Sequence, residues 1–271
     1  MADGRRLQRA AEMMARRIAA IAGDWIDDLR LATGLLTRVP MPHLGGVMPA
    51  GLARAQRAFP LVGAVIGLVV GLADLSLLGI GIPPLVAATL ALGAGAALTG
   101  ALHEDGLADV GDGFGGGRDR ATKLLIMRDS RLGTYGAIIL LVSFSARLSA
   151  LASLPAVAIV PGLVVAHALG RAAIPVLAAR MPFARDDGLG KSAGRPEAAS
   201  AITAIIIAAV IALLCLSGKE ALLALAVTVA GAAAMALLAW RQIGGVTGDV
   251  FGATEQVAET AVLIMLAARL S

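Results

Sequence analysis

The chain has 271 residues, of which 58% are hydrophobic and only 15% are charged, and its formal net charge is +4. Its mean hydropathy is +0.83. This composition excludes an ordinary soluble domain, because helices that are apolar on all sides need lipid as their solvent. We therefore predict an all-α, polytopic integral membrane bundle with about six or seven transmembrane helices, and we expect no nucleic-acid partner.

Residues 1–28 are predicted to form a basic amphipathic segment on the cytoplasmic face of the membrane. Apolar residues recur along one side of this segment, namely Leu7, Met14, Ile18 and Ile21. A helix of this kind lies on the anionic inner leaflet. A cleavable signal is excluded because the apolar run is too short and is interrupted by acids. A merely solvated extension is the alternative. Residues 29–271 are predicted to form a single membrane-embedded domain.

Apolar runs of about 20 residues mark the membrane spans. Six are predicted, at 58–79, 83–102, 133–154, 156–179, 200–217 and 220–240. Residues 257–270 form a shorter seventh candidate. This last run is tilted, extended back through Gln256, or only partly inserted.

The connections between the spans are of two kinds, and this contrast predicts the topology. Three tight hairpins, near Gly81, Pro155 and Gly218, together hold one basic residue, Lys219. The longer connections at 103–132, 180–199 and 241–255, with the first 57 residues, hold nineteen of the 23 Lys and Arg. By the positive-inside rule, the longer connections lie in the cytoplasm, and a multi-pass protein of the bacterial inner membrane is expected.

An acidic segment, HEDGLADVGDGFGGG at 103–117, directly follows the second predicted span. If it is helical, Asp105, Asp109 and Asp112 project from one face within roughly 60°. Three like charges on one face repel, and a hard divalent ion such as Mg²⁺ is the natural cation to offset them. The alternative is a solvated acidic loop.

Two further polar segments are predicted on the same side of the membrane. IMRDSRLGTYG at 126–136 brings Arg128 and Arg131 to the start of the third span. There, a helix N-terminus and two guanidinium groups could hold phosphate oxygens, or the arginines could meet lipid head groups. ARDDGLGK at 184–191 combines acids, a flexible Gly-Leu-Gly and Lys191, without the spacing of a Walker loop.

The last polar segment, GGVTGDVFGATEQVAE at 244–259, places acids at the entrance of the final span. Those acids are Asp249, Glu255 and Glu259. Arg147 and Arg171 are predicted inside the third and fourth spans, where an unpaired charge costs at least about 2.5–3.5 kcal/mol. They pair with carboxylates or bind an anionic substrate. His167 is predicted to be a helix-packing residue rather than a metal ligand.

The four polar motifs, in this order and at these separations, resemble the cobalamin synthase family of adenosylcobinamide-GDP ribazoletransferases. TRVPMP around Arg38 and FPLVGAVIG from Phe59 also fit, so the likeness runs from about residue 29 to the C-terminus. The common form of the first motif has a hydrophobic residue where this chain has Glu104.

The resemblance implies a membrane-bound catalytic domain that joins adenosylcobinamide-GDP to α-ribazole or its 5′-phosphate, releases GMP and requires Mg²⁺. Assembly into a homo-oligomer is a further expectation. Asp109 and Asp249 are the candidates for the base that takes the proton of the ribazole hydroxyl. The predicted metal ligands are Glu104, Asp105, Asp109 and Asp112. The predicted substrate-binding residues are His103, Arg128, Asp129, Ser130, Arg131, Thr134, Lys191, Thr247, Asp249, Glu255 and Glu259.

Two other classes of protein fit the sequence less well. A CDP-alcohol phosphotransferase also uses clustered aspartates on membrane helices, but where that family continues with Arg this chain has Asp109, and the second half of the motif is missing. A divalent-cation transporter needs acids inside its spans. Here the acids are predicted in the connections, apart from Asp74, Glu220 and Glu259 at span edges.

Overall fold

The computed structural model describes residues 23–42 and 49–270. These residues form helices and no strand, apart from a single β-bridge between Phe183 and Val246. A first helix covers 23–36. The others are α2 (Pro49–Ala55), η1 (Gln56–Ala58), α3 (Phe59–Gly79), α4 (Pro84–Thr99), α5 (Leu102–Gly116), α6 (Arg120–Ile126), α7 (Thr134–Ser153), α8 (Ala156–Arg180), α9 (Leu189–Ser192), α10 (Ala198–Cys215), α11 (Gly218–Ile243) and α12 (Gly248–Leu270).

The helical membrane bundle predicted from composition is confirmed. Within the described residues, six helices are long and apolar enough to cross a bilayer, or seven if α4 and α5 are taken as one broken span. The seventh candidate, predicted at 257–270, extends further toward the N-terminus than its apolar run, because α12 begins at Gly248 and has 23 residues. At about 1.5 Å per residue, that length is enough to cross the hydrocarbon core.

The second predicted span, 83–102, is wrong as a single straight helix. α4 ends at Thr99, and α5 leaves it at an angle of 91°. The bend is formed by Gly100 and Ala101, which have positive φ angles of 68° and 53°. Ala101 is strained, since a residue with a Cβ in this region costs roughly 1–2 kcal/mol. A side chain at Gly100 would collide with the Arg38 guanidinium, which lies against the bend.

α8 and α12 form the centre of the bundle. In α8, 78% of the most apolar stretch is buried inside the protein, compared with 22% in α7 and in α11. α3 approaches α8 closely through Gly63 and Gly67, where a Cβ would lie 2.4 and 2.3 Å from carbonyl oxygens of α8. Small residues spaced by four allow this backbone contact between membrane helices.

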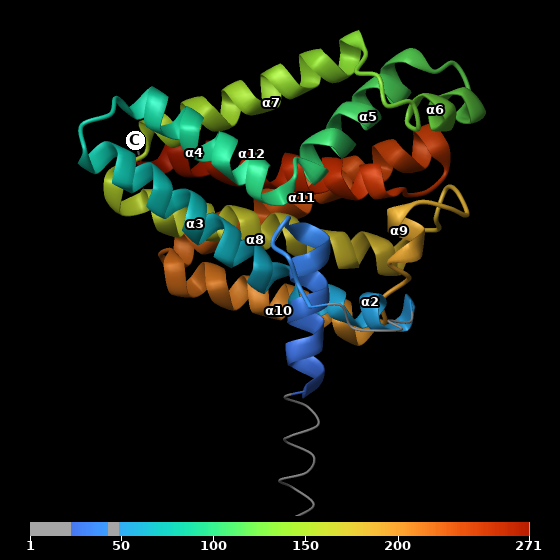
Figure 1. Cartoon of the computed structure of the whole chain (residues 1–271), viewed down its shortest axis with the longest axis horizontal. Helices are drawn as coiled ribbons and strands as arrows, with labels where there is room; N and C mark the ends of the chain where they lie inside the picture. Colours follow the sequence, from blue (N-terminus) through green and yellow to red (C-terminus); the bar gives the residue numbers. More distant parts are fainter. Residues whose placement is uncertain (1–22, 43–48, 271) are drawn as a thin grey trace, which may run out of the picture.

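The polar connections gather at one end of the bundle, as the sequence predicted. In Figure 1 the α3–α4 hairpin and the C-terminal end lie on the left, whereas α2, α6 and α9 lie on the right. Arg120 joins the longer connections directly, because its guanidinium donates to the carbonyls of Ile243 (2.8 Å) and Ala184 (2.5 Å). We call this the motif end. Which side of the membrane it faces stays a prediction.

The helix at 23–36 runs through the predicted segment boundary at residue 28. It is fixed by the fully buried Asp28, which accepts hydrogen bonds from Arg54 (2.9 Å) and Arg57 (2.6 Å). Most of the predicted amphipathic segment, residues 1–22, lies outside the described residues.

Candidate active site

A cavity of about 210 Å³ lies at the motif end, between α5 and α12. Its polar lining comes from four separate parts of the sequence: Gln56, His103, Asp105, Arg185 and Asp249. Apolar side chains of the first helix and α3, among them Leu36 and Phe59, line another part of the wall, together with Ile174 of α8 and Phe251 of α12. The acidic segment at 103–117 and the last polar segment at 244–259 therefore contribute side chains to the same cavity.

Glycines bring α5 and α12 into backbone contact beside this cavity. A Cβ at Gly106 would lie 2.9 Å from the Asp249 carbonyl oxygen, and one at Gly252 would lie 3.1 Å from the His103 Cα. A Cβ at Gly190 would likewise lie 2.7 Å from the Gly248 nitrogen. The glycines of these motifs thus hold the carboxylates of α5 and α12 close together.

The α5 carboxylates share one face, because the segment is helical as the spacing required. Asp109 interacts with three like charges, those of Asp249, Asp105 and Asp112, and with one opposing charge, that of Arg185. One guanidinium beside several carboxylates leaves an excess of negative charge. Oxygen ligands with such an excess suit a hard divalent cation.

Asp249 is held in place by two donors. The Thr247 hydroxyl and the Arg185 guanidinium each lie 3.1 Å from Asp249 Oδ2. Thr247 also accepts the Val250 N–H (3.3 Å) and so caps the first turn of α12. Thr247, predicted to bind substrate, therefore orients Asp249 in this structure.

Asp112 has a different surrounding from the other two α5 aspartates. Its carboxylate accepts the backbone N–H groups of Gly133 (2.7 Å) and Gly136 (2.8 Å), at the start of α7. Asp112 thus already accepts two N–H groups at the helix N-terminus where the sequence predicted substrate phosphate, and phosphate binding there stays a prediction. A metal-binding role for Asp112 stays a prediction.

The predicted phosphate-binding cations lie at the motif end but do not line the cavity. Arg128 pairs with Asp187 at 2.5 Å, and Arg131 pairs with Asp129 at 2.5 Å. The hydrogen bonds from Arg131 lower the pKa of Asp129 to about 2.

Three other predicted substrate-binding residues are also outside the cavity. Lys191 lies 3.5 Å from Asp186 and 5.3 Å from the Phe183 ring centroid, and its neighbours Leu189 and Gly190 do line the cavity. Ser130 and Thr134 are exposed.

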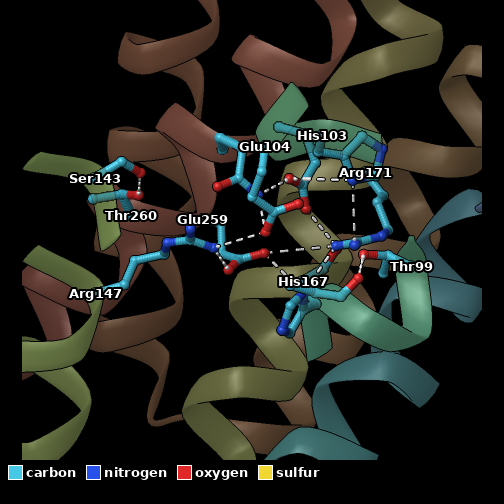
Figure 2. A network of polar contacts seen from close by, with 12 residues as sticks. Thr99, His103, Glu104, Ser143, Arg147, His167, Arg171, Glu259 and Thr260 are labelled. Atoms are coloured by element: carbon cyan, nitrogen blue, oxygen red, sulfur yellow. Dashed lines mark hydrogen bonds and ion pairs between the residues drawn. The ribbon is translucent and has the colours of Figure 1, made fainter. Parts of the chain in front are cut away.

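A second polar cluster lies inside the bundle, where α5, α7, α8 and α12 meet (Figure 2). Arg147 of α7 contacts Glu259 (3.0 Å) and Glu104 (3.4 Å). Arg171 of α8 pairs with Glu255, which is completely buried. The two arginines are therefore partners of carboxylates, one of the two possibilities that the sequence left open.

This cluster corrects the expectation for Glu255, which was predicted in a connection but is buried within α12, and it places Glu259, predicted at a span edge, beside it in the same helix. Neither lines the cavity, and their contact with substrate stays a prediction. Glu104, predicted as a metal ligand, belongs to this cluster through its contact with Arg147, and both are labelled in Figure 2. His103 joins the two sites: it lines the cavity and its Nδ1 lies 3.5 Å from Glu255 Oε2.

His167, Glu255 and Glu259 are close enough together to hold a metal ion. However, the Arg171 guanidinium nitrogen Nη1 contacts all three, lying 2.9 Å from His167 Nδ1 and 3.7 Å from Glu259 Oε2. The Arg171 guanidinium thus occupies the position that a metal ion would take among these three side chains. His167 belongs to this cluster and also lies 2.8 Å from Glu259 through Nδ1.

The sequence motifs predicted no role for Gln56 or Arg185. Both line the cavity, and both keep a buried polar atom, Gln56 Oε1 and Arg185 Nη1, without a hydrogen-bond partner among the described residues. Arg185 lies within the ARDDGLGK motif, which was a usable signal. Gln56 precedes an apolar run and offered none.

Comparison with known proteins identifies the family. The cobalamin-5-phosphate synthase family model matches residues 28–267. Curated proteins named adenosylcobinamide-GDP ribazoletransferase, from Bradyrhizobium diazoefficiens and Rhizobium johnstonii, are 43% and 44% identical, covering 90% and 91% of this chain and 94% and 98% of their own. No solved structure matches. The matched region contains α5 and α12 up to residue 267, and with these relatives it shows that the chain belongs to the cobalamin-5-phosphate synthase family.

Proposed function

We propose that this protein is a Mg²⁺-dependent transferase that joins adenosylcobinamide-GDP to α-ribazole, or to its 5′-phosphate, and releases GMP. The relatives of similar length carry the name of this activity. The observation that carries the proposal is the cavity where Asp105 and Asp249 lie beside Arg185, whose free Nη1 suits a phosphate oxygen.

The carboxylates in and beside the cavity fit a magnesium ion. Asp105 and Asp249 line it, Asp109 interacts electrostatically with both, and Arg185 balances only part of their charge. These three residues are proposed to hold the ion, which when bound would neutralise charge on the pyrophosphate oxygens. Glu104 is left out of this set, because Arg147 holds it.

The reaction is a phosphoryl-group transfer in which one P–O bond replaces another. A ribazole hydroxyl oxygen attacks the phosphorus attached to cobinamide, the bond from that phosphorus to the GMP oxygen breaks, and GMP leaves. Asp249 or Asp109 takes the hydroxyl proton. Asp249 is the better oriented of the two, since Thr247 and Arg185 fix its Oδ2, and no donor from the described residues forms a hydrogen bond with its other oxygen.

The cations at the rim are proposed to contact the diphosphate as the substrate enters. Arg128 and its partner Asp187 are exposed, with 51% and 62% of their side-chain surfaces accessible. Exposed ion pairs contribute only about 0–1 kcal/mol, so a phosphate can displace the carboxylate with little loss. Arg131 and Lys191 are paired in the same exposed manner. We also infer that the motif end faces the cytoplasm.

The test is GMP release by the purified protein in detergent, with adenosylcobinamide-GDP and α-ribazole, with Mg²⁺ or with a chelator. We expect release only with Mg²⁺, and at least a hundredfold slower in Asp249→Asn. Asp27→Asn is the control, because this acid is half exposed and lies outside the cavity. Absence of GMP from the unaltered protein, or equal rates in the two variants, would contradict the proposal.

A further inference from the structure

A second cavity, of about 340 Å³, lies between α8, α10 and α11 and shares no lining residue with the acidic one. Its wall is apolar except for Arg180 and Thr228. Small side chains produce the hollow, since six alanines line it: Ala172, Ala173, Ala208, Ala232, Ala233 and Ala236. We call it the alanine groove.

The length of the alanine groove matches one leaflet of a bilayer. Its lining runs from Leu225 to Ala236 on α11 and from Leu169 to Met181 on α8. At 1.5 Å per residue these stretches are roughly 16 and 18 Å long. Half of the hydrocarbon core is about 15 Å. The groove therefore reaches from the motif end to about the middle of the membrane.

Positive charge marks the motif end of the alanine groove. Arg180 is the last residue of α8 and is exposed, and no carboxylate of the described residues forms an ion pair with it. Arg195 adds a second guanidinium nearby, where it donates to the carbonyls of Ala179 (3.0 Å) and Met181 (2.8 Å). An anionic group at this mouth would meet cations and no competing acid from the lining.

A helix is about 10–12 Å in diameter with its side chains, so a helix of a second copy would reach into the hollow only with side chains. An extended alkyl chain has no polar atoms to satisfy and needs only a narrow channel. The Thr228 hydroxyl can turn to a carbonyl of its own helix.

We propose that the alanine groove binds one acyl chain of an anionic phospholipid, whose phosphate lies at Arg180. The positive-inside rule puts this end in the cytoplasm, where the leaflet is rich in anionic lipids. The lipid would fill the space between α10 and α11 without touching the acidic cavity. Binding is independent of the proposed transferase activity.

The test is native mass spectrometry of protein taken from nanodiscs that contain equal amounts of phosphatidylglycerol and phosphatidylcholine. We expect one phosphatidylglycerol to stay bound through detergent washing. Ala232→Phe fills the groove, and Arg180→Gln removes the charge, so each should weaken retention about tenfold or more. Ala234→Phe and Arg241→Gln are the controls, because both residues are exposed on α11 outside the groove.

Equal retention of the two lipids would overturn the assignment of the phosphate to Arg180. Unchanged retention in both groove variants would overturn the acyl-chain site. Dissociation of a dimer by Ala232→Phe, with no loss of lipid, would show a second copy as the occupant and also overturn the proposal. Circular dichroism of every variant checks that the helices are intact.

Discussion

Gly106→Ala should slow the transferase by about tenfold to a hundredfold without unfolding it. The new Cβ would lie 2.9 Å from the Asp249 carbonyl oxygen and 3.0 Å from its Cα. Both neighbours are backbone atoms and cannot rotate away. Because ordinary contacts begin near 3.4 Å, α5 and α12 must move apart by roughly half an ångström or more.

This separation acts directly on the proposed chemistry. Asp105 and Asp109 lie on α5, whereas Asp249 lies on α12, so the movement changes the spacing of the carboxylates. A misplacement of about 1 Å in an active site can lower the rate about a hundredfold. Half of that displacement gives the lower end of the expected range.

The assay is the initial rate of GMP release in detergent, with the thermal unfolding midpoint measured on the same preparations. Gly93→Ala is the matched control, because Gly93 is also helical but a Cβ added there would meet no atom within 4 Å. Alanine stabilises a helix by up to about 1 kcal/mol relative to glycine. The control should therefore be as active as the unaltered protein and no less stable. Equal rates for the two variants would refute the reasoning.

Arg171→Leu should lower the free energy of unfolding by about 3–5 kcal/mol, because it leaves the buried carboxylate of Glu255 without its cation. Unfolding in a denaturing detergent measures this loss, and a loss below about 1 kcal/mol would contradict the prediction. Asp112→Ala should cost about 2 kcal/mol or more by leaving two N–H groups of α7 without an acceptor, and Asp112→Asn should recover part of that loss. In a Cys215→Ser background, an impermeant thiol reagent outside intact cells should label a cysteine at Ile80 but not one at Gly116; labelling at Gly116 would reverse the topology.

Span positions were predictable because they depend on local composition. α7 and α8 follow their predicted ranges to within one residue, since a long apolar run has no alternative to the bilayer. The 91° bend between α4 and α5 was not predictable from the same signal. The bend brings Gly100 against Arg38, a contact between distant parts of the sequence that a hydropathy profile does not register.

The candidate site was predictable to the extent that it follows helix periodicity. The spacing of Asp105, Asp109 and Asp112 predicted one face, and α5 is helical. The spacing gave no information on what each carboxylate meets. Asp112 caps α7, whereas Asp105 lines the cavity, because the two lie about two turns apart along α5. Predicting the different partners of Asp105 and Asp112 requires knowing where the neighbouring helices lie.

The start of α12 was predicted too late in the sequence, because charged residues lower the average hydropathy of the window around them. Asp249, Glu255 and Gln256 lower the local average, so the apolar run begins only at residue 257, and Glu259 lies near its start. In the bundle the two glutamates are paired with Arg171 and Arg147, which lower the averages of two other spans. Placing each charge alone in lipid costs free energy, but the ion pairs leave few of these charges uncompensated. A profile treats every helix separately and cannot register such compensation. The arginines inside predicted spans were the available signal, because a buried guanidinium requires a carboxylate, and pairing with carboxylates was one of their two predicted roles.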